Sequence, residues 1–166
     1  MNQNLIYRGP EASHATRPIA RRSKGSLRGS IVAALPGFPR PRIIQFESAL
    51  EYAFLCLMLE RDDVYHIQEQ PPAVAFSDAD GRPAHNTFDF LITLTSGERI
   101  AVAIKPMSRV LRLNFVSQLE NIAAAVSKRF ADRVLLVTEQ HIERPKAADA
   151  ARRLAKARPQ LTEVTQ

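Results

Sequence analysis

The fold is decided by the stretch TFDFLITLTSGERIAVAIK at residues 87–105. Its two halves are rich in apolar, aromatic and β-branched side chains, the residue types that favour strands. A serine and a glycine separate the halves, and such a short connection is typical of a β-hairpin. We therefore expect one strand at residues 87–95 and a second, antiparallel strand at residues 99–105.

Helix and strand signals also lie outside this hairpin. Ser48 is a candidate N-cap, and Glu51 lies three residues later, at the spacing of a capping box. The apolar run RVLLVT at residues 133–138 is typical of a buried parallel strand. This order of elements predicts an α/β fold in which helices flank a central mixed β-sheet. The expected helices lie at residues 48–60, 114–130 and 146–157, and the remaining strands lie at residues 64–68, 73–76 and 133–138.

The positive charge is concentrated near the N-terminus. The 166 residues carry a formal net charge of +6, and residues 1–42 hold eight Lys or Arg against one acid. We therefore divide the chain into a basic, flexible arm at residues 1–42, a core at residues 43–140, and a C-terminal helix and tail at residues 141–166. A basic arm is either a solvated tail or a sequence-independent, salt-sensitive contact with DNA phosphates. The candidate DNA contacts are Arg17, Arg21, Arg22, Lys24 and Arg28.

The composition argues against several classes of site and location. The single cysteine, Cys56, excludes an internal disulfide and a cysteine-based zinc cluster, and its apolar neighbours predict a buried structural thiol. No apolar stretch reaches the length of about eighteen residues that a membrane span needs. We expect a cytoplasmic protein that does not contact a membrane.

Three charged residues form a candidate catalytic group. Metal-dependent phosphodiester hydrolysis requires carboxylates that hold a hard cation, and a positive group that stabilises charge on the phosphate. Asp89 interrupts an apolar strand and Lys105 ends the next one, so the hairpin can bring both to one end of the sheet. Glu51 joins them if the first helix packs over the strands. Each also has a structural interpretation: a helix cap for Glu51, an ion pair with Arg99 for Asp89, and a solvated strand end for Lys105.

Four short motifs occur in order between residues 46 and 106. They are FESALEY at residues 46–52, EQP at residues 69–71, TFDFL at residues 87–91 and IKP at residues 104–106. Together they resemble the catalytic domain of the TnsA transposon-end endonucleases, which belong to the PD-(D/E)xK nuclease superfamily. The resemblance extends more loosely to residue 139, and it implies a restriction-endonuclease-like core.

The resemblance also implies roles for individual residues. Glu51 and Asp89 would be ligands of Mg²⁺ or Mn²⁺, and Lys105 would be the catalytic lysine. The family has a Glu or Gln two residues before that lysine, but this chain has Ala103, which offers no side-chain oxygen. Because magnesium keeps several waters, the loss of one ligand weakens binding without necessarily abolishing it. A relocated ligand could come from the next helix, where Gln118 and Glu120 are the candidates.

Three functions remain open on these grounds. The first is a TnsA-like endonuclease that cuts DNA at a transposon or mobile-element end, together with a DDE transposase. The second, favoured by Ala103, is a nuclease-fold module that binds DNA or a recombinase partner without cutting. The third is a restriction or repair nuclease of the same superfamily that acts alone. A chain of this length leaves little room for the family's C-terminal domain, so contact with the ATPase regulator is not expected.

Overall fold

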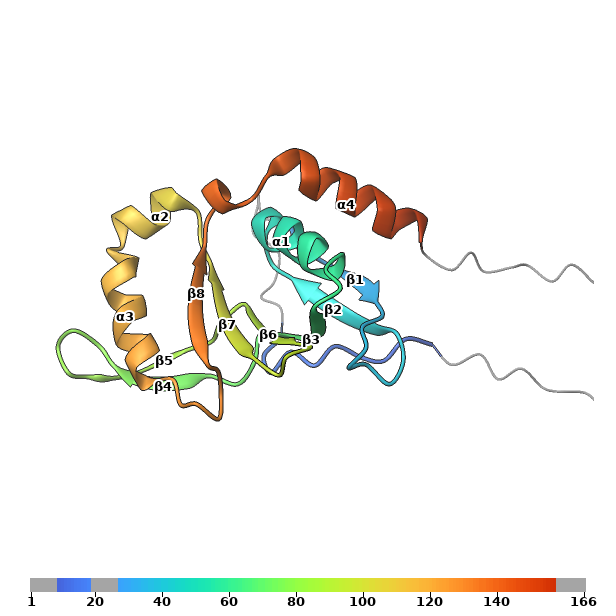
Figure 1. The fold of residues 1–166 in the computed structure, drawn as a ribbon. Helices are drawn as coiled ribbons and strands as arrows, with labels where there is room; N and C mark the ends of the chain where they lie inside the picture. The colour runs from blue at the N-terminus through green and yellow to red at the C-terminus, as the bar shows by residue number, and fades with distance from the viewer. Residues whose placement is uncertain (1–8, 19–26, 158–166) are drawn as a thin grey trace, which may run out of the picture.

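A mixed four-stranded sheet forms the centre of the computed structural model, which describes residues 9–18 and 27–157 (Figure 1). The strand order is β3-β6-β7-β8. Strand β6 is antiparallel to both of its neighbours, β3 and β7, whereas β8 runs parallel to β7. The central mixed sheet, the hairpin at its middle and the parallel last strand are therefore confirmed. The bounds of these strands are Val64–Glu69 (β3), Phe90–Leu94 (β6), Arg99–Ile104 (β7) and Arg133–Val137 (β8).

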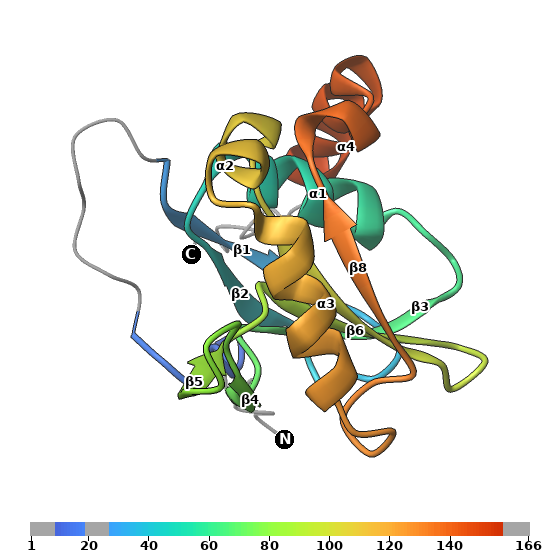
Figure 2. The same ribbon diagram turned by 90° about the vertical axis from the view of Figure 1, so that its left-hand side faces the viewer.

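Helices and small sheets cover the two faces of this sheet. In Figures 1 and 2, α1 and α4 lie on one side together with the β1-β2 hairpin, and α3 lies on the other side with the β4-β5 hairpin. The helices of the described residues are α1 (Ala49–Leu59), α2 (Met107–Arg112), α3 (Phe115–Ala125) and α4 (Arg144–Lys156), with a short 3₁₀ turn at Glu139–His141. The structure is therefore the expected α/β arrangement.

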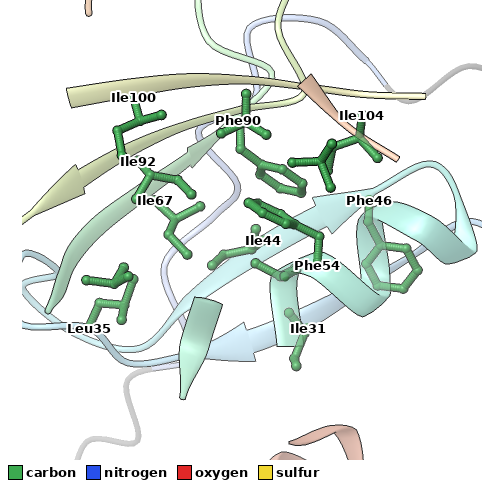
Figure 3. Close-up of a cluster of buried hydrophobic side chains, with 14 of the residues drawn as sticks. Ile31, Leu35, Ile44, Phe46, Phe54, Ile67, Phe90, Ile92, Ile100 and Ile104 are labelled. Atoms are coloured by element: carbon green, nitrogen blue, oxygen red, sulfur yellow. The ribbon is translucent and has the colours of Figure 1, made fainter. Parts of the chain in front are cut away.

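Strand β7 separates two hydrophobic cores. Because successive side chains of a strand point to opposite faces, Ile100, Val102 and Ile104 join the core beneath α1, and Ala101 and Ala103 join the core beneath α3. Figure 3 shows the first core, where Phe54 of α1 stacks on Phe90 of β6 with ring centroids 5.9 Å apart. Cys56 is also fully buried, as its apolar neighbours predict.

The arm at residues 1–42 contains structure that we did not expect. Gly29–Ala33 forms β1, which pairs along its whole length with β2 at Arg42–Phe46. Residues 9–18 also lie against the core, since Glu11 donates a main-chain hydrogen bond to Pro41 and Thr16 donates one to Gln70. The described part of the arm is thus held in place by long-range hydrogen bonds that its basic, proline-rich composition conceals.

Strand β5 and helix α2 were not predicted, and two predicted elements are shorter than expected: β6 is Phe90–Leu94 against the expected 87–95, and α3 is Phe115–Ala125 against 114–130. Strand β5 at Pro83–Asn86 pairs with β4 at Val74–Ser77, although its sequence lacks apolar alternation. Helix α2 begins directly after Pro106, in a segment for which we predicted no helix or strand. Helix α3 ends at Ala125 because the backbone of Val126 is extended. No helix in the described residues has the length and apolar character needed to cross a bilayer.

The loop between β1 and β2 makes one close approach that permits a prediction. The main-chain nitrogen of Gly37 donates to the carbonyl oxygen of Tyr65 at 2.8 Å. A Cβ at Gly37 would lie 2.9 Å from that same oxygen and 2.8 Å from the Tyr65 ring. We therefore expect Gly37→Ala to lower the free energy of unfolding by about 1–3 kcal/mol in urea denaturation. Gly9→Ala is the control, because a Cβ there meets nothing within 4 Å; equal stability of the two variants would contradict the prediction.

Candidate active site

Asp89 lies immediately before β6 and is fixed by the strands on both sides. Its main-chain nitrogen donates to the carbonyl oxygen of Val102 on β7 at 2.9 Å, and its own carbonyl accepts from the nitrogen of Gln70, just after β3, at 2.9 Å. The carboxylate oxygen Oδ2 accepts a hydrogen bond from the nitrogen of Ile104 at 2.6 Å. Because Val102 and Ile104 flank Ala103, the Asp89 carboxylate lies alongside the end of β7.

Glu51 lies in the first turn of α1 and forms part of its N-terminal cap. The Ser48 hydroxyl accepts from the Glu51 nitrogen at 3.1 Å and donates to the Glu51 oxygen Oε1 at 2.9 Å. The other oxygen, Oε2, accepts from the main-chain nitrogen of Glu47 at 2.7 Å. The capping role that the sequence predicts is confirmed. It also holds the carboxylate at the start of the helix, although each oxygen keeps a further lone pair.

The two carboxylates lie close enough to repel each other. Burial raises the pKa of Asp89 to about 7, with a further rise from the negative charge of Glu51. The hydrogen bond from Ile104 and the positive charges of Lys105 and Arg17 act in the opposite direction. Burial also raises the pKa of Glu51. Perturbed carboxylates of this kind are typical of functional sites, where a bound cation favours the ionised forms.

Lys105 follows β7 and completes the group. Its main-chain nitrogen donates to the carbonyl oxygen of Val137, at the end of β8, at 3.0 Å. Its ammonium nitrogen lies 4.3 Å from the centroid of the Phe115 ring, a cation–π contact that directs the side chain toward α3. Strand β8 runs parallel to β7, and Figure 1 shows both strands ending near α2. Glu51 of α1 and Lys105 after β7 therefore both lie close enough to Asp89 to affect its pKa.

The position two residues before the lysine offers no ligand. Ala103 is 6% exposed and packs in the core beneath α3. The proposed replacements, Gln118 and Glu120, are both solvent-exposed on α3, whose buried residues are Phe115, Leu119 and Ile122. The charged residues in the described chain that perturb the pKa of Asp89 are Glu51, Lys105 and Arg17, and Glu120 does not belong to that group.

The basic residues that we proposed as DNA contacts differ in their environments. Arg17 forms a two-point ion pair with Glu47, with nitrogen-to-oxygen distances of 2.7 and 3.3 Å. Since Glu47 also binds Glu51, this pair places a positive charge at the edge of the candidate site. Arg28 is half-buried just before β1. The other candidates for phosphate contact, Arg21, Arg22 and Lys24, lie outside the described residues.

A buried ion pair supports the strand next to Asp89. Arg42 and Glu69 are 1% and 0% exposed, and Nη2 of Arg42 lies 3.4 Å from Oε2 of Glu69. The Ser13 hydroxyl donates to the other Glu69 oxygen at 2.5 Å. Arg42 also contacts ring nitrogens of His14 and His66, at 3.0 and 3.2 Å. We did not predict this pair, because its members lie far apart in the sequence and Arg42 was counted with the basic arm.

Gln70 is a buried polar residue near Asp89 for which the sequence predicted no role. It follows Glu69 directly, is 3% exposed, and has a positive φ of 41°. Within the described residues, its side-chain oxygen Oε1 has no hydrogen-bond partner. The EQP motif marked this position in the sequence, but only as part of a family resemblance.

Two carboxylates at the end of the sheet fit a hard divalent cation in part. Magnesium favours one or two carboxylates and fills its remaining positions with water. Glu51 and Asp89 satisfy that minimum, and the repulsion between them would be relieved by a cation. The described residues contain no cluster of three or more His, Cys, Asp or Glu side chains able to hold a metal. Within this part of the chain, no third side chain of these four types joins Glu51 and Asp89.

Comparison with known proteins adds no assignment: no family model matches the chain, and no curated protein matches it significantly.

Proposed function

We propose that this chain is a TnsA-like, metal-dependent DNA endonuclease that cuts phosphodiester bonds at transposon or mobile-element ends, in concert with a DDE transposase. The observation that carries the proposal is Asp89, with its pKa near 7, held between two strands beside Glu51 and Lys105. These three residue types, in this chain order, are those that the resemblance assigns to the nuclease site. Metal-dependent cleavage of DNA would give each of them a role.

In this proposal each residue has a separate task. Glu51 and Asp89 would hold Mg²⁺ or Mn²⁺, which when bound stabilises charge on the scissile phosphate and lowers the pKa of an attacking water. Lys105 would add a fixed positive charge beside the phosphate. Arg17 lies at the edge of the site, where it could contact the DNA backbone once released from Glu47.

Two observations favour a second candidate, a nuclease-fold module that binds DNA or a recombinase without cutting. Both oxygens of Glu51 are already engaged in the helix cap. Ala103 is packed into a hydrophobic core, so its own position on β7 supplies no ligand. In this alternative the three charged residues are an inherited arrangement that serves stability.

Cleavage of plasmid DNA that carries the mobile-element ends separates the two candidates. We expect the wild-type chain, with its transposase and Mg²⁺ or Mn²⁺, to nick this DNA. We expect Asp89→Asn and Lys105→Ala to lower the rate about a thousandfold, because each removes several kcal/mol of transition-state stabilisation. Asp80→Asn, in the exposed turn between β4 and β5, is the matched control and should cut normally. Absence of cutting by the wild type under all these conditions would favour the non-catalytic module.

A further inference from the structure

Gln70 extends the ladder between β3 and β6 by one residue beyond its last paired position. Glu69 is paired with Phe90, and the Gln70 nitrogen then donates to the carbonyl oxygen of Asp89 at 2.9 Å. On its other side, Asp89 bonds to Val102 and Ile104 of β7. Asp89 therefore lies between Gln70, just past the end of β3, and Ala103 of β7.

Gln70 is held in a conformation that is unfavourable by itself. A left-handed backbone is unfavourable for a residue with a side chain, and a buried oxygen without a hydrogen bond adds a further cost. The residue is kept there by Thr16, whose nitrogen and hydroxyl both donate to the Gln70 carbonyl, at 3.0 and 2.9 Å. Strain and an unsatisfied buried oxygen at one position, next to a candidate catalytic residue, indicate a functional demand on that oxygen.

We propose that Oε1 of Gln70 is the third protein ligand of the divalent cation held by Glu51 and Asp89, supplying from β3 the oxygen that Ala103 lacks on β7. This inference rests on the proposed function. An amide oxygen is a suitable ligand for Mg²⁺ or Mn²⁺, which take carbonyl oxygens as well as carboxylates. It adds no negative charge to a site where two carboxylates already repel each other.

The alternatives from the sequence are weaker on the same criteria. Gln118 and Glu120 are exposed on α3, where water satisfies their polar atoms. Neither is attached to Asp89 through the main chain, as Gln70 is. Metal binding that depends on Gln70 and is independent of Gln118 therefore distinguishes the proposed ligand from the relocated helix ligand.

The test is binding of Mn²⁺ to the full chain, measured at pH 8 by the EPR signal of the free ion. Gln70→Met keeps the side-chain length but removes the oxygen. We expect it to weaken Mn²⁺ binding about tenfold to a hundredfold, since loss of even an outer-shell partner has effects of that size. Gln140→Met, in the exposed 3₁₀ turn, is the matched control, and Gln118→Met tests the rival ligand; both should bind like the wild type. Circular dichroism verifies that each variant is folded.

A second variant keeps the test decisive if Gln70→Met does not fold. Gln70→Glu retains an oxygen at the same place and should bind Mn²⁺ more tightly than the wild type; unchanged or weaker binding would overturn the proposal. The proposal is also overturned if Gln70→Met binds normally, or if Gln118→Met shows the loss instead. Asp89→Asn distinguishes a failure of the proposed Gln70 ligand from a failure of the proposed metal-dependent function. If Asp89→Asn abolishes binding while Gln70→Met does not, only the role of Gln70 fails; if the wild type binds no Mn²⁺, the proposed metal-dependent nuclease fails as well.

Discussion

Asp89→Asn is expected to stabilise the metal-free protein at pH 8 by an amount on the order of 2–4 kcal/mol. Burial and the charge of Glu51 raise the pKa of Asp89 to about 7 in the folded state, whereas an aspartate in an unfolded chain titrates near 3.9. Between these values the folded state binds more protons, so the free energy of unfolding falls as the pH rises. Asparagine cannot ionise, yet its oxygen can still accept the hydrogen bond from Ile104.

Urea denaturation in EDTA at two pH values measures this effect. The advantage of Asp89→Asn should be complete at pH 8 and should shrink to less than about 1 kcal/mol at pH 4.5, where the folded wild type is protonated. Asp63→Asn provides a control of opposite sign, because Arg61 lowers the pKa of the exposed Asp63. A loss of stability in Asp89→Asn at pH 8 would show that the carboxylate is well satisfied without a cation. The expected gain instead means that the ionised Asp89 carboxylate destabilises the metal-free fold, which is the behaviour that the proposed cation site requires.

Arg42→Met is expected to lower the free energy of unfolding by about 3–5 kcal/mol. The substitution leaves Glu69, which is fully buried, without its cation. It also removes the guanidinium contacts to His14 and His66 and its stacking over Phe38, where Cζ lies 4.0 Å from the ring centroid. An uncompensated buried charge is far more damaging than loss of a surface ion pair.

Two further variants decide whether the effect arises from charge burial. Arg61→Met breaks an exposed pair with Asp63 that has a 2.6 Å contact, and it should change stability by less than about 1 kcal/mol. In the double variant Arg42→Met, Glu69→Met, both charges are replaced, and most of the lost stability should return. Failure of the second substitution to restore stability would mean that Arg42 contributes chiefly through its packing.

The sequence was informative where structure is specified locally. Ser48 and Glu51 predict the start of α1 because an N-cap involves residues only three apart. The apolar run before Thr138 predicts β8, and its parallel pairing with β7 is confirmed. The sequence also predicts that Asp89 and Lys105 lie at the same end of the sheet, because a tight hairpin fixes the register of its two strands.

Prediction failed where the partner of a residue is distant. Arg42 can be buried because it pairs with Glu69, which is 27 residues away. Its local sequence, a basic residue among prolines, does not indicate this burial. β1 and β5 have little apolar alternation, and they form because β2 and β4 supply the facing hydrogen-bonding edges. The strained backbone of Gln70 is likewise imposed by Thr16 and Asp89 rather than by its own residue type.

The attachment of residues 9–18 to β3 has a consequence for the order of events during synthesis. Ser13 bonds to a residue 56 positions later, and Thr16 to one 54 positions later. Both therefore leave the ribosome well before their partners exist, and such distant contacts form slowly. The Arg42–Glu69 pair gains its last hydrogen bond, from Ser13, only when this early segment returns to the sheet. We therefore expect Ser13 and Thr16 to reach their native positions only after Glu69 and Gln70 have been synthesised.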